Sequence, residues 1–546
     1  MLGRRIIAAT VLSVLSSFTS VAMAQDWIYT TTKGDNLWNL SEQYLDRVTR
    51  FEALRKINGI ENPKQMPPGI KLRIPLKWIR SNPVPATVDE LLGDAQLQRA
   101  GTSEQLALQH GDEVFLGDQI RTGGDSTLAI RFADNSILTL YADSLIRFDH
   151  LSAHGKTGMV DSRLNLIQGR MDTRVTPASG PGSRFEIQTP SAISAVRGTE
   201  YRALVGEDGK VSNIEVLHGK VKVSGAGKHT LVKRGFGTQV AEGKAPIKPR
   251  KLLPPPGLTA FDAPVRNVSQ LVSWPAVDKA EAYRAEVSAD ADFDVVQWSR
   301  ISEYAKIALP DIADGEYYLR VRAIDALGLE GLNSVQPFVL DAHPQPPLQL
   351  QPVPEQVLRG DTAVLQWTAS ADAARYRLEI ATDEAFTQLV IDQDDITGSR
   401  FDTADLPVPG EYYWRLTSIT ASGEQGPVGI SRSWQVKPAP EKVEAAVGAV
   451  SEDGKLVASW RAGSAEQQYQ VQMATDENFE DLLLDQLQDE ARISFDAVEG
   501  QVRYLRVRSV ESDGYQGPWG TVQRILPIPD YTPLWLSGAA MLLLIL

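Results

Sequence analysis

The first strong pattern of apolar and polar positions lies in residues 26–76. A short strand is expected over Trp27–Thr31, and a Lys-Gly-Asp turn follows it. Apolar residues then recur at the spacing of one helical face: Leu37, Leu40 and Tyr44. Asn36 stands just before this face, and its short polar side chain is suited to cap the first helix.

A second helix is expected after Thr49, because Thr49 and Glu52 have the spacing of a capping box. Its apolar stripe consists of Phe51, Leu54 and Ile57, and the Asn58-Gly59 pair ends it. After a Pro-Pro-Gly turn, apolar residues alternate with basic ones in a half-buried strand: Ile70, Leu72 and Ile74. The pattern therefore predicts a compact strand–helix–helix–strand unit.

Residues 86–245 read as strands and turns, without a helical period of useful length. Apolar residues alternate with small or polar ones on both sides of an Asp-Asn-Ser turn: Leu128, Ile130, Phe132, then Leu138 and Leu140. A second alternating pair, Ile214 and Val216, precedes His218-Gly219, and Val221 and Val223 follow it. This pattern predicts a hairpin with a tight two-residue turn.

The C-terminal half contains one pattern three times. Trp274, Trp367 and Trp460 are spaced 93 residues apart, and a tyrosine follows each nine residues later: Tyr283, Tyr376 and Tyr469. A tryptophan that faces tyrosine and valine positions across two short sheets suits a sandwich of about 100 residues. We therefore expect three β-sandwich repeats, at residues 257–341, 346–437 and 440–527.

Apolar segments lie at both ends of the sequence. Residues 1–24 combine two arginines, an apolar run and an Ala-Met-Ala site, which predicts a cleaved export signal rather than a retained anchor. Residues 531–546 carry no charge, and as a helix they would span only about 24 Å of a hydrocarbon core about 30 Å thick. We expect a C-terminal membrane anchor there; the alternative is a tail packed on the last sandwich.

Composition narrows the class of protein. With 546 residues, 42% of them hydrophobic and 23% charged, the chain has room for several ordinary globular domains. Its net charge of -14 argues against a nucleic-acid partner, which would need a basic face. The absence of cysteine excludes disulfides and thiolate sites.

Three phrases of the N-terminal unit, YTTTKGDNLWNLSEQY, LRKING and PPGIKLRIP, occur in the order typical of a LysM module, which residues 26–76 resemble. LysM modules bind N-acetylglucosamine-containing glycans such as peptidoglycan or chitin. The resemblance implies a shallow groove between two loops, whose glycan-binding residues by position are Gly34, Asp35, Asn36, Leu37, Asn58, Gly59, Ile60, Met66 and Pro67. A neutral sugar needs apolar surface and a few hydrogen bonds rather than charge. The alternative is that these residues serve only turns and caps.

The phrases GDQIRTG and TPSAISAVRGTEY resemble a FecR domain, over about residues 86–245. The family implies a β-rich periplasmic domain used in envelope sensing and signalling. In iron-transport regulators it acts on a cytoplasmic sigma factor through an N-terminal segment, and the expected export signal argues against that role here. Arg197, Gly198, Thr199 and Glu200 could present a charge pair to a partner. The alternative is a strand-entry turn with an internal ion pair, and Arg121, Thr122 and Gly123 pose the same choice between turn and binding.

The three repeats resemble fibronectin type III domains. Trp298, Trp414 and Trp519 lie off the repeated core pattern, so they are the candidates for glycan binding by exposed aromatic rings. The expected fold class is therefore multidomain and mainly β, with a small βααβ LysM unit, an all-β FecR-like domain and three β-sandwich repeats.

Catalytic motifs are missing from the sequence. His150 and His154 are four residues apart without an HExxH pattern, and neither a Gly-x-Ser-x-Gly elbow nor a phosphate-binding loop occurs. The acidic pairs Asp383-Glu384 and Asp476-Glu477 recur at matching repeat positions, which favours solvated turns. We expect no enzymatic activity, cofactor or metal.

The expected function is that of an exported protein of the periplasm or cell envelope that binds peptidoglycan and carries a FecR-like sensing domain. One alternative is a signal-transduction component that acts through an envelope membrane protein. The other is a wall hydrolase with an unrecognised active site.

Overall fold

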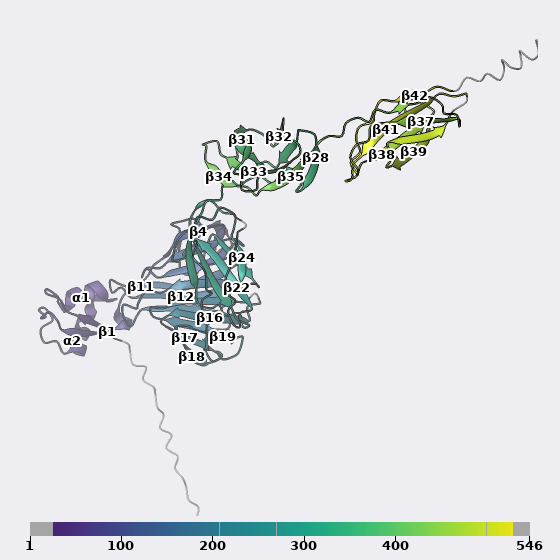
Figure 1. Ribbon diagram of the computed structural model, residues 1–546. Coiled ribbons are helices and arrows are strands. Elements are labelled where there is room, and N and C mark those ends of the chain that lie inside the picture. Colours follow the sequence, from purple (N-terminus) through teal and green to yellow (C-terminus); the bar gives the residue numbers. More distant parts are fainter. Residues whose placement is uncertain (1–25, 207, 269, 498–499, 528–546) are drawn as a thin grey trace, which may run out of the picture. The chain divides into compact units, whose positions relative to one another are not determined.

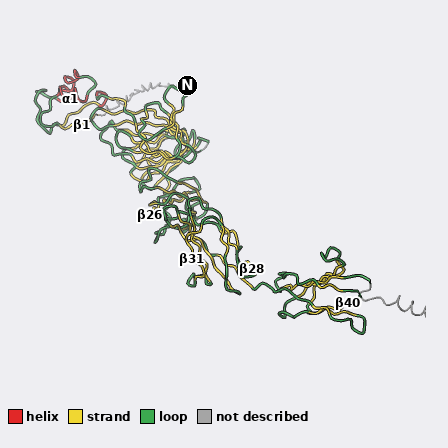
Figure 2. Tube along the Cα trace, turned by 90° about the horizontal axis from the view of Figure 1, so that it is seen from above, coloured by secondary structure: helices red, strands yellow, loops and turns green. Residues whose placement is uncertain are grey.

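The computed structural model describes residues 26–206, 208–268, 270–497 and 500–527, so the expected signal and C-terminal anchor lie outside the described residues. Strands dominate, as the sequence predicted, and in the described part both α-helices belong to the N-terminal unit (Figures 1 and 2). Neither of these helices has the length and apolar character needed to cross a bilayer. The chain divides into two compact units, residues 1–342 and 343–546, which are described separately.

The N-terminal unit has the predicted order: β1 (Asp26–Thr30), α1 (Leu37–Tyr44), the 3-10 turn η1 (Val48–Arg50), α2 (Phe51–Asn58) and β2 (Lys71–Pro75). β1 and β2 pair in an antiparallel register, with Trp27 opposite Ile74. Asn36 caps α1 as expected, because its side-chain oxygen accepts a hydrogen bond from the backbone N–H of Asn39 at 2.8 Å. Gly59 ends α2 in the left-handed conformation, with φ of 62°.

Two expectations for α2 are wrong. The capping box does not form, because the chain enters α2 through η1 and Arg50 occupies the cap position without a side-chain bond. Glu52 instead accepts a hydrogen bond from Arg55 at 3.1 Å. Ile57 is 44% exposed, because α2 is a short helix that turns only its Leu54 face fully onto the small core.

Within the first compact unit (residues 1–342, called unit 1), the N-terminal unit is followed by a closed barrel of strands β3–β20. Its strands are β3 (Ser81–Pro83), β4 (Ala86–Leu92), β5 (Ala95–Gln98), β6 (Gln105–Ala107), β7 (Glu113–Val114), β8 (Gln119–Thr122), β9 (Thr127–Arg131), β10 (Ile137–Leu140), β11 (Leu145–His154), β12 (Val160–Arg174), β13 (Arg184–Gln188), β14 (Ile193–Val196), β15 (Glu200–Val205), β16 (Val211–His218), β17 (Lys220–Gly225), β18 (Lys228–Lys233), β19 (Phe236–Ala241) and β20 (Arg250–Lys251). The predicted strands around Leu128 and Leu138 are β9 and β10, which pair directly.

The barrel wall consists of two hydrogen-bonded layers that share β12. The first half of β12 pairs with β11 and β13, and its second half pairs with β10 and β15. Gly169, with φ of 92°, lies at the change of layer. A Cβ there would come within 2.5 Å of the Cα of Ser144, so this crossing requires glycine.

The predicted hairpin around His218-Gly219 does not form. β16 pairs with β15 and β19, whereas β17 pairs with β14 and β18 in the other layer. Alternation identified both strands correctly, since Ile214, Val216, Val221 and Val223 are all buried. It could not identify their partners, because an alternating pattern fixes which face is buried but not which neighbour a strand meets.

The first sandwich completes unit 1. Its strands are β21 (Leu271–Ser273), β22 (Ala282–Ser288), β23 (Trp298–Ser302), β24 (Lys306–Ala308), β25 (Gly315–Ile324) and β26 (Ser334–Leu340). β21 and β24 form one sheet, and β23-β22-β25-β26 form the other. The outer face of this four-stranded sheet packs against the second barrel layer, as the hydrogen bond from Thr127 on β9 to the carbonyl of Val296 shows.

Unit 2 contains the second and third sandwiches. The second has β27 (Gln349–Gln351), β28 (Gln356–Arg359), β29 (Val364–Trp367), β30 (Arg375–Ala381), β31 (Leu389–Ile396), β32 (Arg400–Asp402), β33 (Gly410–Ile419), β34 (Gln425–Val428) and β35 (Arg432–Lys437). The third has β36 (Ala446–Val447), β37 (Lys455–Ser459), β38 (Gln468–Ala474), β39 (Leu482–Gln488), β40 (Arg492–Asp496), β41 (Arg503–Val510) and β42 (Gln523–Ile525).

The repeated Trp–Tyr pair forms each sandwich core, as predicted. The ring centroids of Trp274 and Tyr283 are 5.4 Å apart, and the matching distances are 5.7 Å and 5.3 Å in the second and third repeats. All three pairs meet edge to face, the arrangement that the ring quadrupoles favour. Each tyrosine hydroxyl also accepts a hydrogen bond from a backbone N–H six residues earlier, which fixes the turn before the strand.

Candidate functional site

The two loops expected to form a glycan groove lie together in the N-terminal unit. The backbone N–H of Leu37 donates to the carbonyl of Pro63 at 2.9 Å. The Thr31 hydroxyl donates to the carbonyl of Pro67 at 2.7 Å and accepts from the N–H of Ile70 at 2.9 Å. The start of α1 and the α2–β2 loop are therefore held side by side.

Two of the predicted contact residues present no side chain at the surface. Leu37 is fully buried and Met66 is 5% exposed, because both belong to the core of this unit. Only their backbone groups could reach a sugar.

The first loop is shaped by its own polar side chains. Asp35 accepts hydrogen bonds from the Tyr29 hydroxyl at 2.8 Å and the Thr32 N–H at 2.6 Å. Gly34 is exposed, and its φ of 97° allows the sharp turn before Asn36. These bonds leave part of the Asp35 and Asn36 side chains exposed to solvent.

The second loop has one predicted contact residue whose polar atoms serve the fold. The Asn58 amide donates to the carbonyls of Leu54 and Arg73 and accepts from the Arg73 N–H, at distances of 3.0, 2.9 and 2.7 Å. This residue therefore ties α2 to β2. Gly59 and Pro67 are exposed and Ile60 is half-buried, so these three residues form the rim next to the first loop.

An exposed aromatic residue near the start of α1, one position after Leu37, was not predicted. Trp38 on α1 is 52% exposed, and its ring centroid lies 5.3 Å from that of Phe51. An indole ring offers a flat apolar face against which a pyranose can pack. The feature of the sequence that could have indicated it is a tryptophan directly after Leu37, off the apolar face of the first helix.

A second candidate region lies where the barrel meets the first sandwich, around the buried carboxylate of Glu286. Arg170 from β12 donates to Glu286, and so do Arg320 at 2.6 Å and Arg322 at 2.8 Å from β25. Burial alone would raise the pKa of Glu286, but the surrounding guanidinium groups hold it well below its usual range. The interface therefore contains a charged cluster that is closed to solvent.

Glu215 and Glu330 extend this cluster. Glu330 pairs with Arg284 at 2.7 Å, and its backbone N–H donates to Glu215 at 2.7 Å. Burial raises the pKa of Glu215 to about 7, although Arg202 donates to it at 2.7 Å. The pKa of Glu330 is lowered, because its four arginine neighbours outweigh its burial.

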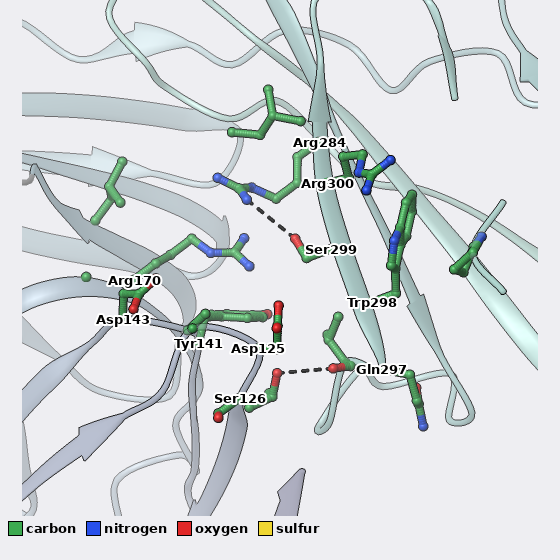
Figure 3. Close-up of a pocket in the computed structure, with 18 of the residues that line it drawn as sticks. Asp125, Ser126, Tyr141, Asp143, Arg170, Arg284, Gln297, Trp298, Ser299 and Arg300 are labelled. Atoms are coloured by element: carbon green, nitrogen blue, oxygen red, sulfur yellow. Dashed lines mark hydrogen bonds between the residues drawn. The ribbon is translucent and has the colours of Figure 1, made fainter. Parts of the chain in front are cut away.

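A groove of about 1320 Å³ opens beside this cluster (Figure 3). Asp125, Tyr141 and Asp143 line it from the barrel. Trp298, Ser299 and Arg300 line it from the first sandwich, together with Arg284, whose guanidinium lies 3.5 Å from the Ser299 hydroxyl. Charged groups, hydroxyls and one half-buried indole face the same space, so the groove can offer both hydrogen bonds and an apolar surface.

The other predicted aromatic candidates differ in position. Trp414 is fully buried beside Trp367, so the glycan role expected for it is wrong. It fills the core position that Leu319 and Leu505 occupy in the other repeats. Trp519 is half-buried beneath two arginines.

The Arg197–Glu200 segment is the strand-entry turn between β14 and β15. The internal ion pair expected as the alternative to binding is absent, since these two side chains form no salt bridge with each other. Thr122 is likewise structural, because its buried hydroxyl donates to the carbonyl of Tyr141 at 2.6 Å. The acidic turn of the second repeat behaves as predicted: Asp383 accepts from the N–H groups of Thr387 and Gln388.

In the part of the chain that the structure describes, no group of three or more histidine, cysteine or acidic side chains is placed to hold a metal ion.

Comparison with known proteins gives two family matches. Residues 29–75 match the LysM domain model, and residues 118–222 match the model for FecR protein. An uncharacterized protein of Treponema pallidum (strain Nichols) is 23% identical over 356 residues, which are 60% of this chain. The match covers 49% of that relative, so the chain spans about half its length.

Solved structures show only weak overall likeness. A proposed anti-sigma factor from Parabacteroides distasonis matches 24% of this chain and 59% of its own at 16% identity, with a TM-score of 0.21. The FN1–FN3 domains of chicken CNTN1 match 50% of this chain and 99% of their own at 15% identity, with a TM-score of 0.23. By its family matches, the chain contains a LysM domain at residues 29–75 and a FecR-type region at residues 118–222.

Proposed function

We propose that this chain is a non-enzymatic protein of the bacterial cell envelope that holds peptidoglycan, or another N-acetylglucosamine glycan, through residues 26–76. The observation that carries the proposal is the pair of adjoining loops joined by the Leu37–Pro63 hydrogen bond within the LysM match. In this proposal the chain is exported, and residues 531–546 attach it to a membrane.

The chemistry of the rim suits a neutral sugar. Gly34, Gly59 and Pro67 bring backbone groups to the surface without bulky side chains, and Trp38 adds an apolar face. We propose that the sugar ring packs on Trp38 while its N-acetyl group bonds to the backbone between the two loops. Binding then depends on shape and hydrogen bonds, so it should change little with salt concentration.

Cosedimentation of the full chain with purified peptidoglycan tests this proposal. We expect saturable retention that soluble N-acetylglucosamine oligomers reverse, and a clear loss of retention in Trp38→Ala. Tyr304→Ala, which removes another exposed aromatic ring, is the matched control. Retention no greater than that of an unrelated acidic protein would refute glycan binding, and clearing of peptidoglycan in a zymogram would refute the non-enzymatic role.

A second candidate function is that of a signalling component that acts through an envelope membrane protein. It is favoured by the groove that the FecR-type barrel and the first sandwich build jointly, beside the ion cluster that joins them. A ligand in this groove would touch both domains and could change how firmly they are held together. In-cell crosslinking from Arg300, which is exposed at the groove, tests this idea. Failure to capture any membrane protein would refute it.

A further inference from the structure

The three sandwiches share a motif on the outer face of the larger sheet, and in the first repeat the barrel covers it. One arginine of the strand that contains the Gly-Glu-Tyr-Tyr or equivalent phrase lies over a phenylalanine ring, at 4.0, 3.9 and 4.0 Å in the three repeats. The arginines are Arg320, Arg415 and Arg506, and the rings are Phe293, Phe386 and Phe479. The same sheet position therefore carries a guanidinium in cation–π contact with a phenylalanine ring in every repeat.

The partner of this arginine differs among the repeats. Directly across the ladder stand Glu286, Glu379 and Gln472. Arg320 pairs with Glu286 at 2.6 Å, and Arg415 pairs with Glu379 at 2.8 Å. In the third repeat the carboxylate is replaced by an amide, so Arg506 donates to the neutral oxygen of Gln472 at 2.9 Å.

A second arginine in the third repeat has the same environment. Arg508 donates to the amide oxygen of Gln470 at 2.8 Å. In the described part of the chain, no carboxylate oxygen lies within 4.0 Å of Arg506 or Arg508. The nearby carboxylate of Asp485 instead accepts from the amides of Gln470 and Gln472, at 2.7 and 3.0 Å. Two positive charges thus lie side by side with no carboxylate in direct contact, and the charge of Asp485 acts on both from behind the two glutamines' amides.

Aromatic rings hold both arginines in place. The ring of Trp519 lies 4.3 Å from the guanidinium carbon of each, and Arg506 also contacts Phe479. Partial burial lowers the pKa of both groups. A guanidinium fixed by stacking loses little freedom when it binds an anion, and its fork matches a carboxylate.

We propose that this face of the third sandwich, defined by Gln470, Gln472, Arg506, Arg508 and Trp519, binds an extended acidic segment of a partner protein. Arg506 and Arg508 alternate along β41, so their side chains leave the strand about 7 Å apart. Carboxylates at alternate positions of an extended segment have the same spacing. This role is separate from the glycan binding proposed for residues 26–76.

A protein segment fits better than a free anion for two reasons. Leu487 lies opposite Gln470 in the ladder and is 53% exposed, so an apolar side chain of the partner would gain contact there. In the first repeat, moreover, the equivalent sheet face packs on a protein surface, where Glu286 meets Arg170 of the barrel. The sheet face of the third repeat presents arginines that bond to amides and not to carboxylates, so its partner must supply the carboxylates.

The test uses the full chain and a fluorescent synthetic peptide in which glutamate and leucine alternate. We expect saturable binding that weakens with added salt, and about tenfold or greater loss of affinity in the double variant Arg506→Gln/Arg508→Gln. Gln472→Glu restores the carboxylate present in the first two repeats. It should weaken binding to a similar extent, because the new carboxylate would pair with Arg506, in a chain whose thermal unfolding shows it to be folded.

Two controls make the outcome specific. Arg415→Gln, at the same position in the second repeat, should leave peptide affinity unchanged, because that arginine already has its carboxylate. A peptide with glutamine in place of glutamate should not bind. The proposal is overturned if Gln472→Glu binds the acidic peptide as well as the natural chain does. Binding of oligogalacturonate but not of the peptide would likewise contradict a protein partner.

Discussion

Arg170 on β12 of the barrel donates to Glu286 on β22 of the first sandwich, and both side chains are buried. The two residues are 116 positions apart, and their contact joins two domains that the sequence separates by a proline-rich linker. A buried carboxylate is stable only with such partners. The barrel and the first sandwich therefore each supply charged groups that the other needs when the cluster is buried.

Removal of the central carboxylate should destabilise unit 1. In Glu286→Gln, Arg170, Arg320 and Arg322 remain buried with too little negative charge, which costs about 3–5 kcal/mol by analogy with broken buried pairs. Thermal unfolding should show an earlier transition, and proteolysis should cut sooner between the barrel and the sandwich. Glu316→Gln, at an exposed position of β25, is the control and should change neither. Equal stability of both variants would contradict the role of the cluster.

The stability of unit 1 should also fall between pH 5 and pH 7.5. Burial raises the pKa of Glu215 to about 7 from an ordinary value of 4.5, so the folded state holds a proton that the unfolded state releases. Its stabilising contribution is complete below the unfolded pKa and is lost as the pH rises through 7. A shift of this size corresponds to a loss on the order of 3 kcal/mol. Denaturant unfolding should show this slope in the natural chain and a flatter one in Glu215→Gln.

The hydroxyl of the core tyrosine should contribute measurably to each sandwich. In Tyr283→Phe the backbone N–H of Val277 loses its 2.8 Å bond, and an unsatisfied amide costs about 1–3 kcal/mol. Tyr304→Phe, where the ring is 68% exposed, should be neutral. Urea unfolding of both variants would measure the difference, and the same midpoint for the two would exclude the proposed bond.

Gly169 offers a test of the barrel crossing. In Gly169→Ala the new methyl would collide with the backbone of Ser144 and would also impose a left-handed conformation on alanine. We expect loss of several kcal/mol of stability or failure to fold. Gly227→Ala has a similar φ of 74° but open space around the Cβ, so it should cost only about 1 kcal/mol. Comparable losses in the two variants would show that conformation, not contact, governs both sites.

The sequence predicted the parts of the fold whose apolar residues face one core. The Trp274–Tyr283 pair and the βααβ order follow from spacing alone, because each element there buries a single face. β16 shows the limit: Ile214 faces the barrel core, whereas Glu215 on the opposite face is also buried. An alternating polar residue looks the same whether water or a buried arginine solvates it, so the docking of barrel and sandwich was not predicted.

The candidate glycan site was predicted as a pair of loops more accurately than as a set of side chains. Spacing placed Gly34 and Gly59 at the correct turns, since left-handed backbone requires small residues there. It could not show that Leu37 points into the core or that the Asn58 amide forms hydrogen bonds with the backbone of β2. Those facts depend on how α1 and α2 rotate against the two strands.

Calorimetric titration of the full chain with soluble N-acetylglucosamine oligomers measures glycan binding by residues 26–76 without a pulldown. We expect saturable heat at one site per chain, little dependence on salt, and strongly reduced affinity in Trp38→Ala. Absence of any saturable heat with these oligomers, from a chain whose thermal unfolding shows it to be folded, would contradict glycan binding by residues 26–76.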